Sequence, residues 1–362
     1  MTNRINNMIL DNFKKKSMER IKNSKMPEFK YGLNILIRPE DFELDKIKIK
    51  QGNNSDKKNK INEEIKPFLT DEWDLDNNKV NYFNQANLNK ITFIEIPKNT
   101  AQKEIYIDIN TKDNIIHYIF IKAKENSNAK ITINKSGNPF YASENIRIIA
   151  EKDVNLSILN IENFGVKTTN FEKRISFIGE NSKIDWFDIS IGSLYHRAET
   201  TSILKERNSE VQHTVIYLSK KEQKKDLFSS AIHISKETKS NLKAKGALKD
   251  YSKVLSRSII KIEEGASDSD GYEKQDALIL SENAEADAMP QLEIKNPNVK
   301  CSHGSTIGQI DKEKIFYLMS RGLDIEKAKK KIVEGYFNNT LEQIENVKIR
   351  EKIKKIIGKK LK

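Results

Sequence analysis

The residues best suited to chemistry are Cys301 and His303, the single cysteine of the 362-residue chain and a histidine two positions after it. Residues two apart in a β-strand point to the same face, so a strand through this stretch would aim both side chains into one space. A thiolate and an imidazole that converge in this way suit zinc, iron or sulfur transfer. Gly304 and Gly308 follow and let the backbone turn. The alternative is a small buried cysteine beside a structural histidine.

Two ligands do not complete a metal site, because structural zinc ions and iron–sulfur clusters usually have four protein ligands. If Cys301 and His303 bind metal, the remaining ligands must come from another chain. The pair therefore predicts a site shared across an interface rather than a self-contained enzyme.

Other chemical motifs are missing or incomplete. The sequence contains no P-loop, no Gly-x-Gly-x-x-Gly and no Gly-x-Ser-x-Gly, which argues against a bound nucleotide and against a serine hydrolase. The run Asp268-Ser269-Asp270-Gly271 resembles the start of a calcium loop but lacks the closing glutamate, so a plain turn is favoured. The remaining histidines are isolated, and we expect a structural or surface role for each of them: His117, His196, His213 and His233.

The elements that would position the pair are short β-strands. From about residue 90, runs of β-favouring residues recur, bounded by polar turns. Turns that precede a new strand recur at a nearly constant spacing, near Ser127, Val154, Ser182, Ser209, Thr238 and Ala266. This even period indicates a β-solenoid, in which each coil buries its inner face by stacking on its neighbours. An antiparallel sandwich would give similar strands, but not so even a period.

The next step in this series, from Ala266 to Ala284, is clearly shorter than the steps before it. We therefore expect the solenoid register to break just before the stretch that holds Cys301.

Helices follow the last strand. Asp311 can cap a helix that runs through Ser320 and stops at Arg321-Gly322, and Asp324 can cap a second helix. A third helix is expected from residues 341–344 onward, ending in a basic tail over residues 348–362. Their apolar faces suit packing on the end of the solenoid or docking a partner.

Composition and the first 90 residues bound the class of protein. Residues 1–26 have apolar positions at near-helical spacing (Ile5, Met8, Ile9, Phe13 and Ile21), which predicts a helix that packs on the body of the protein or on a partner. Residues 26–32 read as a connector and residues 48–66 as an exposed polar loop.

No apolar run is long enough to span a membrane, and one cysteine excludes an internal disulfide, so we expect a cytoplasmic protein.

The formal net charge is +12, from 64 Lys and Arg against 52 Asp and Glu. The lysines are spread along the whole chain among acidic residues, which looks more like a compositional bias than a nucleic-acid-binding patch. A basic solenoid that binds nucleic acid or another polyanion stays open as an alternative from a different class.

Three segments around the Cys301 stretch closely resemble the SufB/SufD family, the scaffold subunits of the SUF iron–sulfur cluster assembly system. They are Pro290-Gln291-Leu292-Glu293-Ile294, the run from Val299 through Cys301-Ser302-His303-Gly304 to Gln309, and Phe316-Tyr317-Leu318-Met319-Ser320-Arg321-Gly322. The close match covers about residues 270–337. The resemblance implies a mainly β fold, a right-handed parallel β-helix over residues 91–309, with helical regions at 1–90 and 310–362.

Two positions make the chain look like SufD rather than SufB. SufB-type chains carry a cysteine associated with sulfur acceptance where this chain has Gln275, and Glu-His-Glu-Ala where it has Ser302-His303-Gly304-Ser305. The resemblance therefore implies a non-catalytic scaffold subunit that pairs with SufB. A transient iron–sulfur cluster would form at their interface, with His303 as the main ligand and Cys301 as an auxiliary one.

The family resemblance also implies the partners. The C-terminal helices would dock the ATPase SufC through Phe316, Tyr317, Arg321 and Gly322, and the chain would bind no nucleotide, nucleic acid or membrane itself. A homodimeric scaffold that works without SufB is the alternative within the family. The type of cluster and any flavin bound to the complex are left open by the sequence.

Overall fold

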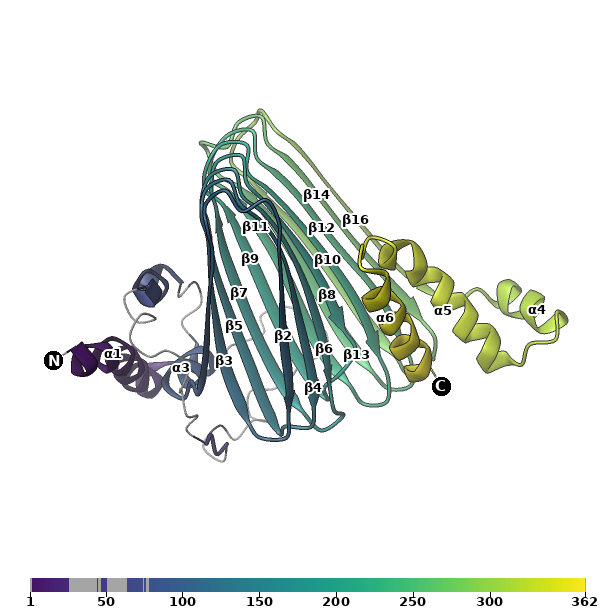
Figure 1. The fold of residues 1–362 in the computed structure, drawn as a ribbon. Helices are drawn as coiled ribbons and strands as arrows, with labels where there is room; N and C mark the ends of the chain where they lie inside the picture. Colours follow the sequence, from purple (N-terminus) through teal and green to yellow (C-terminus); the bar gives the residue numbers. More distant parts are fainter. Residues whose placement is uncertain are drawn as a thin grey trace.

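The chain folds around two facing parallel β-sheets of eight strands each, which together form a β-solenoid (Figure 1). The structure, a computed structural model, describes residues 2–25, 44, 47–50, 64–73, 75 and 78–361, with side chains from residue 9 onward. Consecutive strands alternate between the sheets, so each coil adds one strand to either sheet. The predicted mainly β solenoid with helices at both ends is confirmed.

The odd-numbered strands form sheet A and the even-numbered strands form sheet B. Sheet A consists of β1 (Lys90–Ile96), β3 (Ile115–Ala123), β5 (Tyr141–Ala150), β7 (Thr169–Ile178), β9 (Tyr195–Leu204), β11 (Lys224–His233), β13 (Lys253–Ile262) and β15 (Glu285–Ile294). Sheet B consists of β2 (Lys103–Thr111), β4 (Asn128–Gly137), β6 (Asn155–Phe164), β8 (Lys183–Ser190), β10 (Glu210–Ser219), β12 (Lys239–Leu248), β14 (Asp270–Ile279) and β16 (Lys300–Gln309).

Two features of the sequence explain the coils: the alternation of inward and outward side chains along each strand, and the residues that turn the corners between strands. Along β4, Ile131 and Ile133 point into the core between the sheets, while the residues between them face outward. One corner of successive coils is turned by a residue with positive φ, a conformation that Asn and Asp adopt most readily after Gly. These residues, with φ between 54° and 59°, are Asn99, Asn126, Asp153, Asn181 and Asn208. Their side chains also bond from coil to coil, as where Asn208 donates to Asn181 over 3.0 Å.

The expected break in register before Cys301 is wrong. Strand β15 pairs with β13 and β16 pairs with β14 without any slip. Ala266 and Ala284 lie in turns on different sides of the coil, one after β13 and one after β14, so the short step between them compares two unlike corners. The true successor of the corner at Asp268 is Asn298, whose carbonyl accepts from the Asp268 N–H over 2.8 Å.

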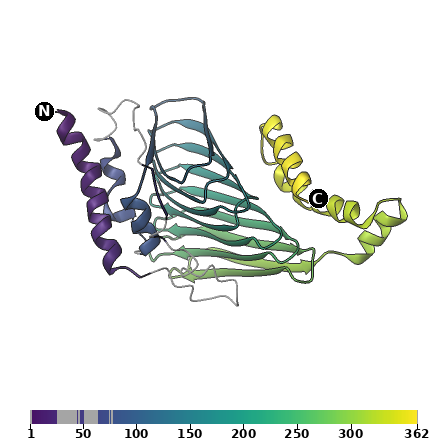
Figure 2. The same ribbon diagram turned by 90° about the horizontal axis from the view of Figure 1, so that it is seen from below.

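The N-terminal helices cover the outer face of sheet A (Figure 2). Helix α1 (Thr2–Asn23) packs on α3 (Lys79–Ala86), and the Ser17 hydroxyl donates to Gln85 over 2.7 Å. The predicted N-terminal helix therefore packs on the body of the protein. The expected connector at 26–32 and most of the expected loop at 48–66 lie outside the described residues.

The C-terminal helices lie on the opposite side of the solenoid, where the last two of them pack against sheet B (Figure 2). They are α4 (Lys312–Ser320), α5 (Ile325–Leu341) and α6 (Val347–Lys360). Asp311 and Asp324 cap the first two, as predicted, because their carboxylates accept from N–H groups of the first turn. A third helix is present, as predicted, but it begins at Val347 rather than near residues 341–344. The residues expected to form a basic tail belong to this helix, α6, which is capped by Asn346 and buries its apolar face on sheet B. None of the described helices has the length and apolarity needed to cross a membrane.

Candidate functional site

The C-terminal end of the solenoid has uncovered edges. Strand β16 is hydrogen-bonded to β14 on one side, and no described strand pairs with its other side. Strand β15 forms the matching edge of sheet A. Ile294 and Ile307, on these two strands, are substantially exposed. Unpaired edge strands present backbone donors and acceptors that another strand can use, so this end is suited to pairing with a second protein.

Cys301 and His303 lie together at this end. Both are on β16, opposite Gly271 and Glu273 of β14, and their side chains point toward the space between the sheets. Cys301 is half-buried and packs against the core, whereas the His303 side chain is 49% exposed. The structure thus places the two predicted side chains on one face, at the mouth of the solenoid.

Gly271 makes room for the thiol. A Cβ atom at this position would lie 3.0 Å from Cys301 Sγ and 3.0 Å from a methyl group of Ile260, closer than side chains normally pack. Its φ is not left-handed, so the glycine is needed for space rather than for backbone conformation. Sequence reasoning could not associate Gly271 with the site, because it meets Cys301 only through the stacking of coils.

Glu273 is the other residue of the site that sequence reasoning missed. Its side chain is fully buried, and neither carboxylate oxygen has a hydrogen-bond partner among the described residues. His303 Nδ1 lies 3.7 Å from Glu273 Oε1. Burial raises the pKa of Glu273, and the nearby Ser258 hydroxyl and His303 ring work against that rise.

The same surroundings keep Cys301 protonated. Burial, together with the negative charges of Glu273 and Asp270, raises the pKa of the Cys301 thiol to about 11. The described residues contain no group of three His, Cys, Asp or Glu side chains that could hold a metal ion. Cys301 and His303 therefore form half of a site at most, open on the side where another chain could complete it.

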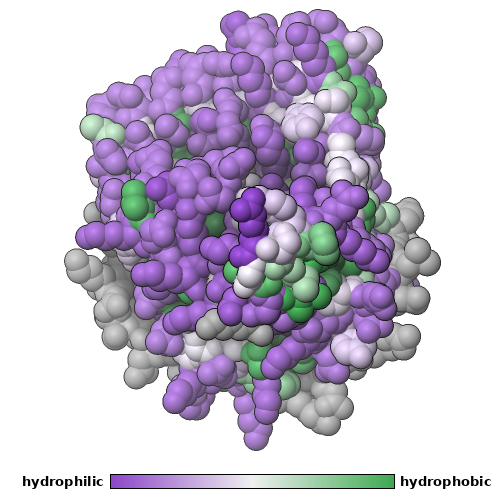
Figure 3. Space-filling model, turned by 90° about the vertical axis from the view of Figure 1, so that its right-hand side faces the viewer, coloured by the Kyte–Doolittle hydropathy of each residue, from purple (hydrophilic) through white to green (hydrophobic). Residues whose placement is uncertain are grey.

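The residues expected to dock a partner lie on and just after α4, which projects away from the solenoid (Figure 1). Phe316 is 74% exposed, and Tyr317 is also exposed, with Arg321 stacked on its ring at 5.3 Å. Gly322 ends the helix with φ at 91°. Figure 3 views this end of the molecule, where hydrophobic atoms gather within a mostly hydrophilic face. Met319 and Ile325 contribute further exposed apolar surface here.

The space between the sheets holds a buried network of charged residues that we did not predict. Lys135 donates to Glu144 over 2.8 Å and to Glu172 over 2.6 Å, and Arg174 joins Glu172 to Asp188. Asp188 also contacts His213, whose Nε2 lies 2.7 Å from Asp188 Oδ2. His196, Glu162 and Lys225 extend the network on the other side. Part of the signal is present in the sequence, since these residues share the inward phase of their strands with apolar residues, as Glu162 does with Leu156 and Ile158 of β6.

Burial and mutual pairing set the charges in this network. Burial alone would raise the pKa of Asp188, but Arg174 and His213 outweigh it and hold that pKa well below its usual range. Burial lowers the pKa of Lys225 to about 8 despite the nearby Glu162. Burial also lowers the pKa of His196 to about 3, so its ring is neutral at pH 7. The paired network has the features of a structural interior rather than of a ligand site.

The other histidines and the acidic turn have structural roles, as expected. His117 is buried beside Thr92 at 2.8 Å, and His233 contacts two hydroxyls at 2.7 Å each. Asp268 turns a corner of the solenoid with φ at 60° and accepts from Asn298 over 2.8 Å.

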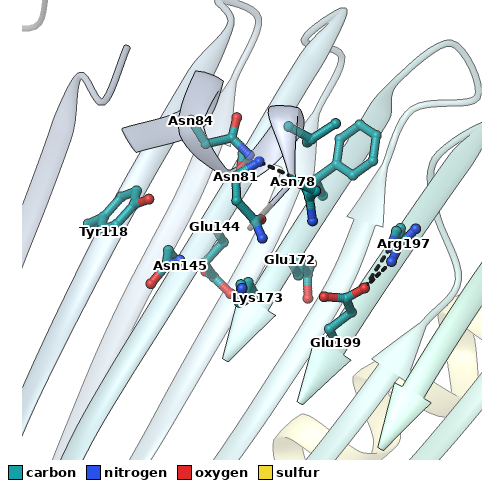
Figure 4. A pocket seen from close by; sticks show the side chains of 13 residues that line it. Asn78, Asn81, Asn84, Tyr118, Glu144, Asn145, Glu172, Lys173, Arg197 and Glu199 are labelled. Carbon is teal, nitrogen blue, oxygen red and sulfur yellow. Dashed lines mark hydrogen bonds and ion pairs between the residues drawn. The ribbon is translucent and has the colours of Figure 1, made fainter. Parts of the chain in front are cut away.

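A small polar pocket lies between α3 and the outer face of sheet A (Figure 4). Asn78, Asn81 and Asn84 line it from the helix side. On the sheet side, Arg197 is paired with Glu199. Because the charged groups of its described lining are engaged with neighbours, the pocket has little with which to select a ligand.

A family model described as "SUF system FeS cluster assembly, SufBD core domain" matches residues 107–336. The iron–sulfur cluster assembly protein SufD of Bacillus subtilis is 24% identical over 306 residues, which are 82% of this chain and 70% of that protein.

Two further relatives carry the SufBD family description. An iron–sulfur cluster assembly SufBD family protein of Antithamnion sp. is 34% identical over 48% of this chain and 58% of its own length. One of Staphylococcus epidermidis is 26% identical over 72% of this chain and 57% of its own length. The alignments thus span less than two thirds of these two relatives.

Proposed function

This chain belongs to the SufBD family of the SUF iron–sulfur cluster assembly system, and from that premise we propose that it is a SufD-like scaffold subunit. In this proposal it pairs with a SufB-like subunit through the C-terminal end of its solenoid. It has no catalytic activity of its own, and the nascent cluster forms at the interface of the two subunits.

The observation that carries this proposal is the half-site at an uncovered end. The edges of β15 and β16 are open to pairing with another chain, and His303 and Cys301 lie at that edge with no further metal ligands among the described residues. A cluster bound here needs ligands from a partner, and the partner's strands would bring them in by pairing with the edge.

The SufD-like assignment is supported by the position of Gln275. It lies on β14, one inward position beyond Glu273, where SufB-type chains carry their sulfur-accepting cysteine. Gln275 is buried and hydrogen-bonded to Ser258, so the position is filled by a structural amide. In this chain it offers no nucleophile, and sulfur would arrive through the partner.

The iron–sulfur cluster is the cargo that is assembled here. The two candidate ligands differ in whether they must lose a proton before they bind iron. His303 can bind iron through a ring nitrogen without losing a proton, provided that the ring is neutral. Cys301 must release its thiol proton to solvent before sulfur binds iron, because burial raises its pKa to about 11. We therefore assign the first contact to His303 and an auxiliary role to Cys301.

The exposed surface of α4 supports docking of a SufC-like ATPase. Phe316 and Tyr317 expose aromatic surface on a helix that projects from the body, and aromatic residues supply much of the binding energy at protein interfaces. Helices α5 and α6 are anchored on sheet B and would transmit motion of the bound ATPase to the solenoid.

The test is co-purification with SufB-like and SufC-like proteins from the same source, followed by iron and sulfide analysis. We expect Phe316→Ala/Tyr317→Ala to lose the SufC-like protein and keep the SufB-like one. His303→Ala should keep both partners and lose cluster loading. Recovery of neither partner by the wild-type chain would reject the proposal. A homodimer of this chain that loads a cluster without the SufB-like protein would favour the homodimeric alternative.

A further inference from the structure

Glu273 is a buried carboxylate with no ion pair to any described lysine or arginine. Neither oxygen forms a hydrogen bond of ordinary geometry, although the Ser258 hydroxyl, the Gln291 N–H and the His303 ring lie near enough to oppose the rise of its pKa. Elsewhere in the interior of the solenoid, buried carboxylates are paired, as Glu172 is with Lys135. A buried carboxylate without hydrogen bonds is costly to folding, so its presence calls for a role.

The donors near Glu273 are the Ser258 hydroxyl, the Gln291 N–H and the His303 ring, and only the His303 ring belongs to the candidate half-site. In the coil below, Glu273 lies opposite Leu242, which cannot bond to it. On its own strand, Gln275 is engaged with Ser258. In the coil above, it lies directly opposite His303, whose Nδ1 is 3.7 Å from Oε1. The carboxylate is thus aimed at one of the two nitrogens of the candidate ligand.

We propose that Glu273 is a positioning residue that keeps the proton of the neutral His303 ring on Nδ1 and leaves the lone pair of Nε2 free to bind iron. A histidine that binds metal through one nitrogen commonly donates its other N–H to a carboxylate, which fixes both the tautomer and the ring orientation. Glu273 is too deeply buried to reach a ligand at the mouth of the solenoid, so it acts through His303. What Nε2 binds rests on the proposed function, whereas the tautomer does not.

The experiment is nitrogen-15 NMR of the histidine side chains in the isolated full-length chain, at pH 8 and without metal. His303→Gln identifies the His303 signals. We expect the wild-type ring to be mainly in the Nδ1–H tautomer. In Glu273→Leu, which has similar volume and no acceptor, we expect the population to shift toward the Nε2–H tautomer. Gln275→Leu is the control, because it removes a buried polar group on the same face and leaves the His303 contact in place.

A wild-type ring in the Nε2–H form would overturn the proposal, as would a tautomer that Glu273→Leu leaves unchanged. If Glu273→Leu does not fold, Glu273→Gln replaces it: its amide accepts more weakly, so a smaller shift in the same direction is expected, and no shift overturns the proposal. A correct tautomer combined with normal cluster loading by His303→Ala would instead reject the proposed function and leave the tautomer assignment standing.

Discussion

The two candidate ligands at the end of the solenoid differ in how accessible they are and in how readily they could bind a metal. His303 is half-exposed and borders a buried carboxylate, while Cys301 is packed against the core over Gly271. In the free subunit, burial and two nearby carboxylates raise the pKa of the thiol to about 11, so it stays protonated well above neutral pH. An exposed single cysteine would be open to oxidation, so this protonation protects the site before assembly.

This state of Cys301 can be measured by alkylation. With iodoacetamide, we expect the rate in the folded chain to rise about tenfold per pH unit from pH 8 to 10, because only the thiolate reacts. The control is the same chain in guanidinium chloride, where the thiol should titrate near its ordinary pKa of about 8.5 and the rate should level off above it. A folded chain whose rate levels off by pH 9 would contradict the raised pKa.

Sequence reasoning reached only part of this site. The two-residue spacing was enough to place Cys301 and His303 on one face, because that depends on strand geometry alone. Glu273 and Gly271 lie one full coil earlier in the chain and become neighbours only through the length of that coil. The short step from Ala266 to Ala284 hides the register that joins them, because these two residues lie in unlike corners of the coil.

Among the elements, the C-terminal helices divide into an anchored pair and a projecting one. Phe337, Val333 and Leu341 of α5 are buried against sheet B together with residues of α6. By contrast, α4 contributes one buried residue, Ile315, and exposes its aromatic residues. Capping residues at Asp311 and Asp324 were sufficient to predict the first two helices. The start of α6 was missed because the apolar residues before Asn346 extend the helical pattern across the turn.

This division predicts different costs for two phenylalanine truncations. Phe337→Ala should destabilise the packing of α5 by about 3–5 kcal/mol, because it leaves a cavity in a buried cluster. Phe316→Ala should change stability by less than about 0.5 kcal/mol, because its ring is mostly in solvent. Guanidinium unfolding followed by helical circular dichroism measures both. Equal effects of the two substitutions would contradict the arrangement of these helices.

At the scale of the whole molecule, the solenoid has an interior that is apolar in part and ionic in part. A stack of coils can be stabilised by apolar residues alone, so the charged network from Lys135 to Lys225 is an additional feature. Its members are buried, and each of its acids lies beside a lysine or an arginine. The even period of the turns is sufficient to predict the coils. To predict which residues the coils enclose, it is also necessary to know which residues of each strand point inward.

Buried neutral histidines make the whole fold sensitive to acid. Burial lowers the pKa of His117 and His196 to about 3 and that of His233 to about 4. Below their unfolded pKa of about 6.5 the unfolded chain binds more protons than the folded one, so stability falls as pH decreases toward 4. The expected slope is at most roughly 1.4 kcal/mol per pH unit for each histidine.

Urea unfolding between pH 4 and pH 7 tests this dependence. His233→Asn retains hydrogen-bonding capacity near Thr238 and Ser240 and should reduce the slope. Carboxylates with lowered pKa values, such as Asp188, add to the loss of stability at still lower pH. A stability that stays constant from pH 6.5 to pH 4 would contradict the assignment of these rings as neutral and buried.

The central claim is that the open end of this solenoid supplies His303 to an iron–sulfur cluster completed by a partner. The most direct measurement is the iron and acid-labile sulfide bound per complex of this chain with its SufB-like and SufC-like partners. We predict that His303→Ala abolishes or strongly reduces both while the complex stays intact, and that the neighbouring Ser302→Ala leaves both unchanged. Wild-type iron and sulfide in an intact His303→Ala complex would contradict the claim.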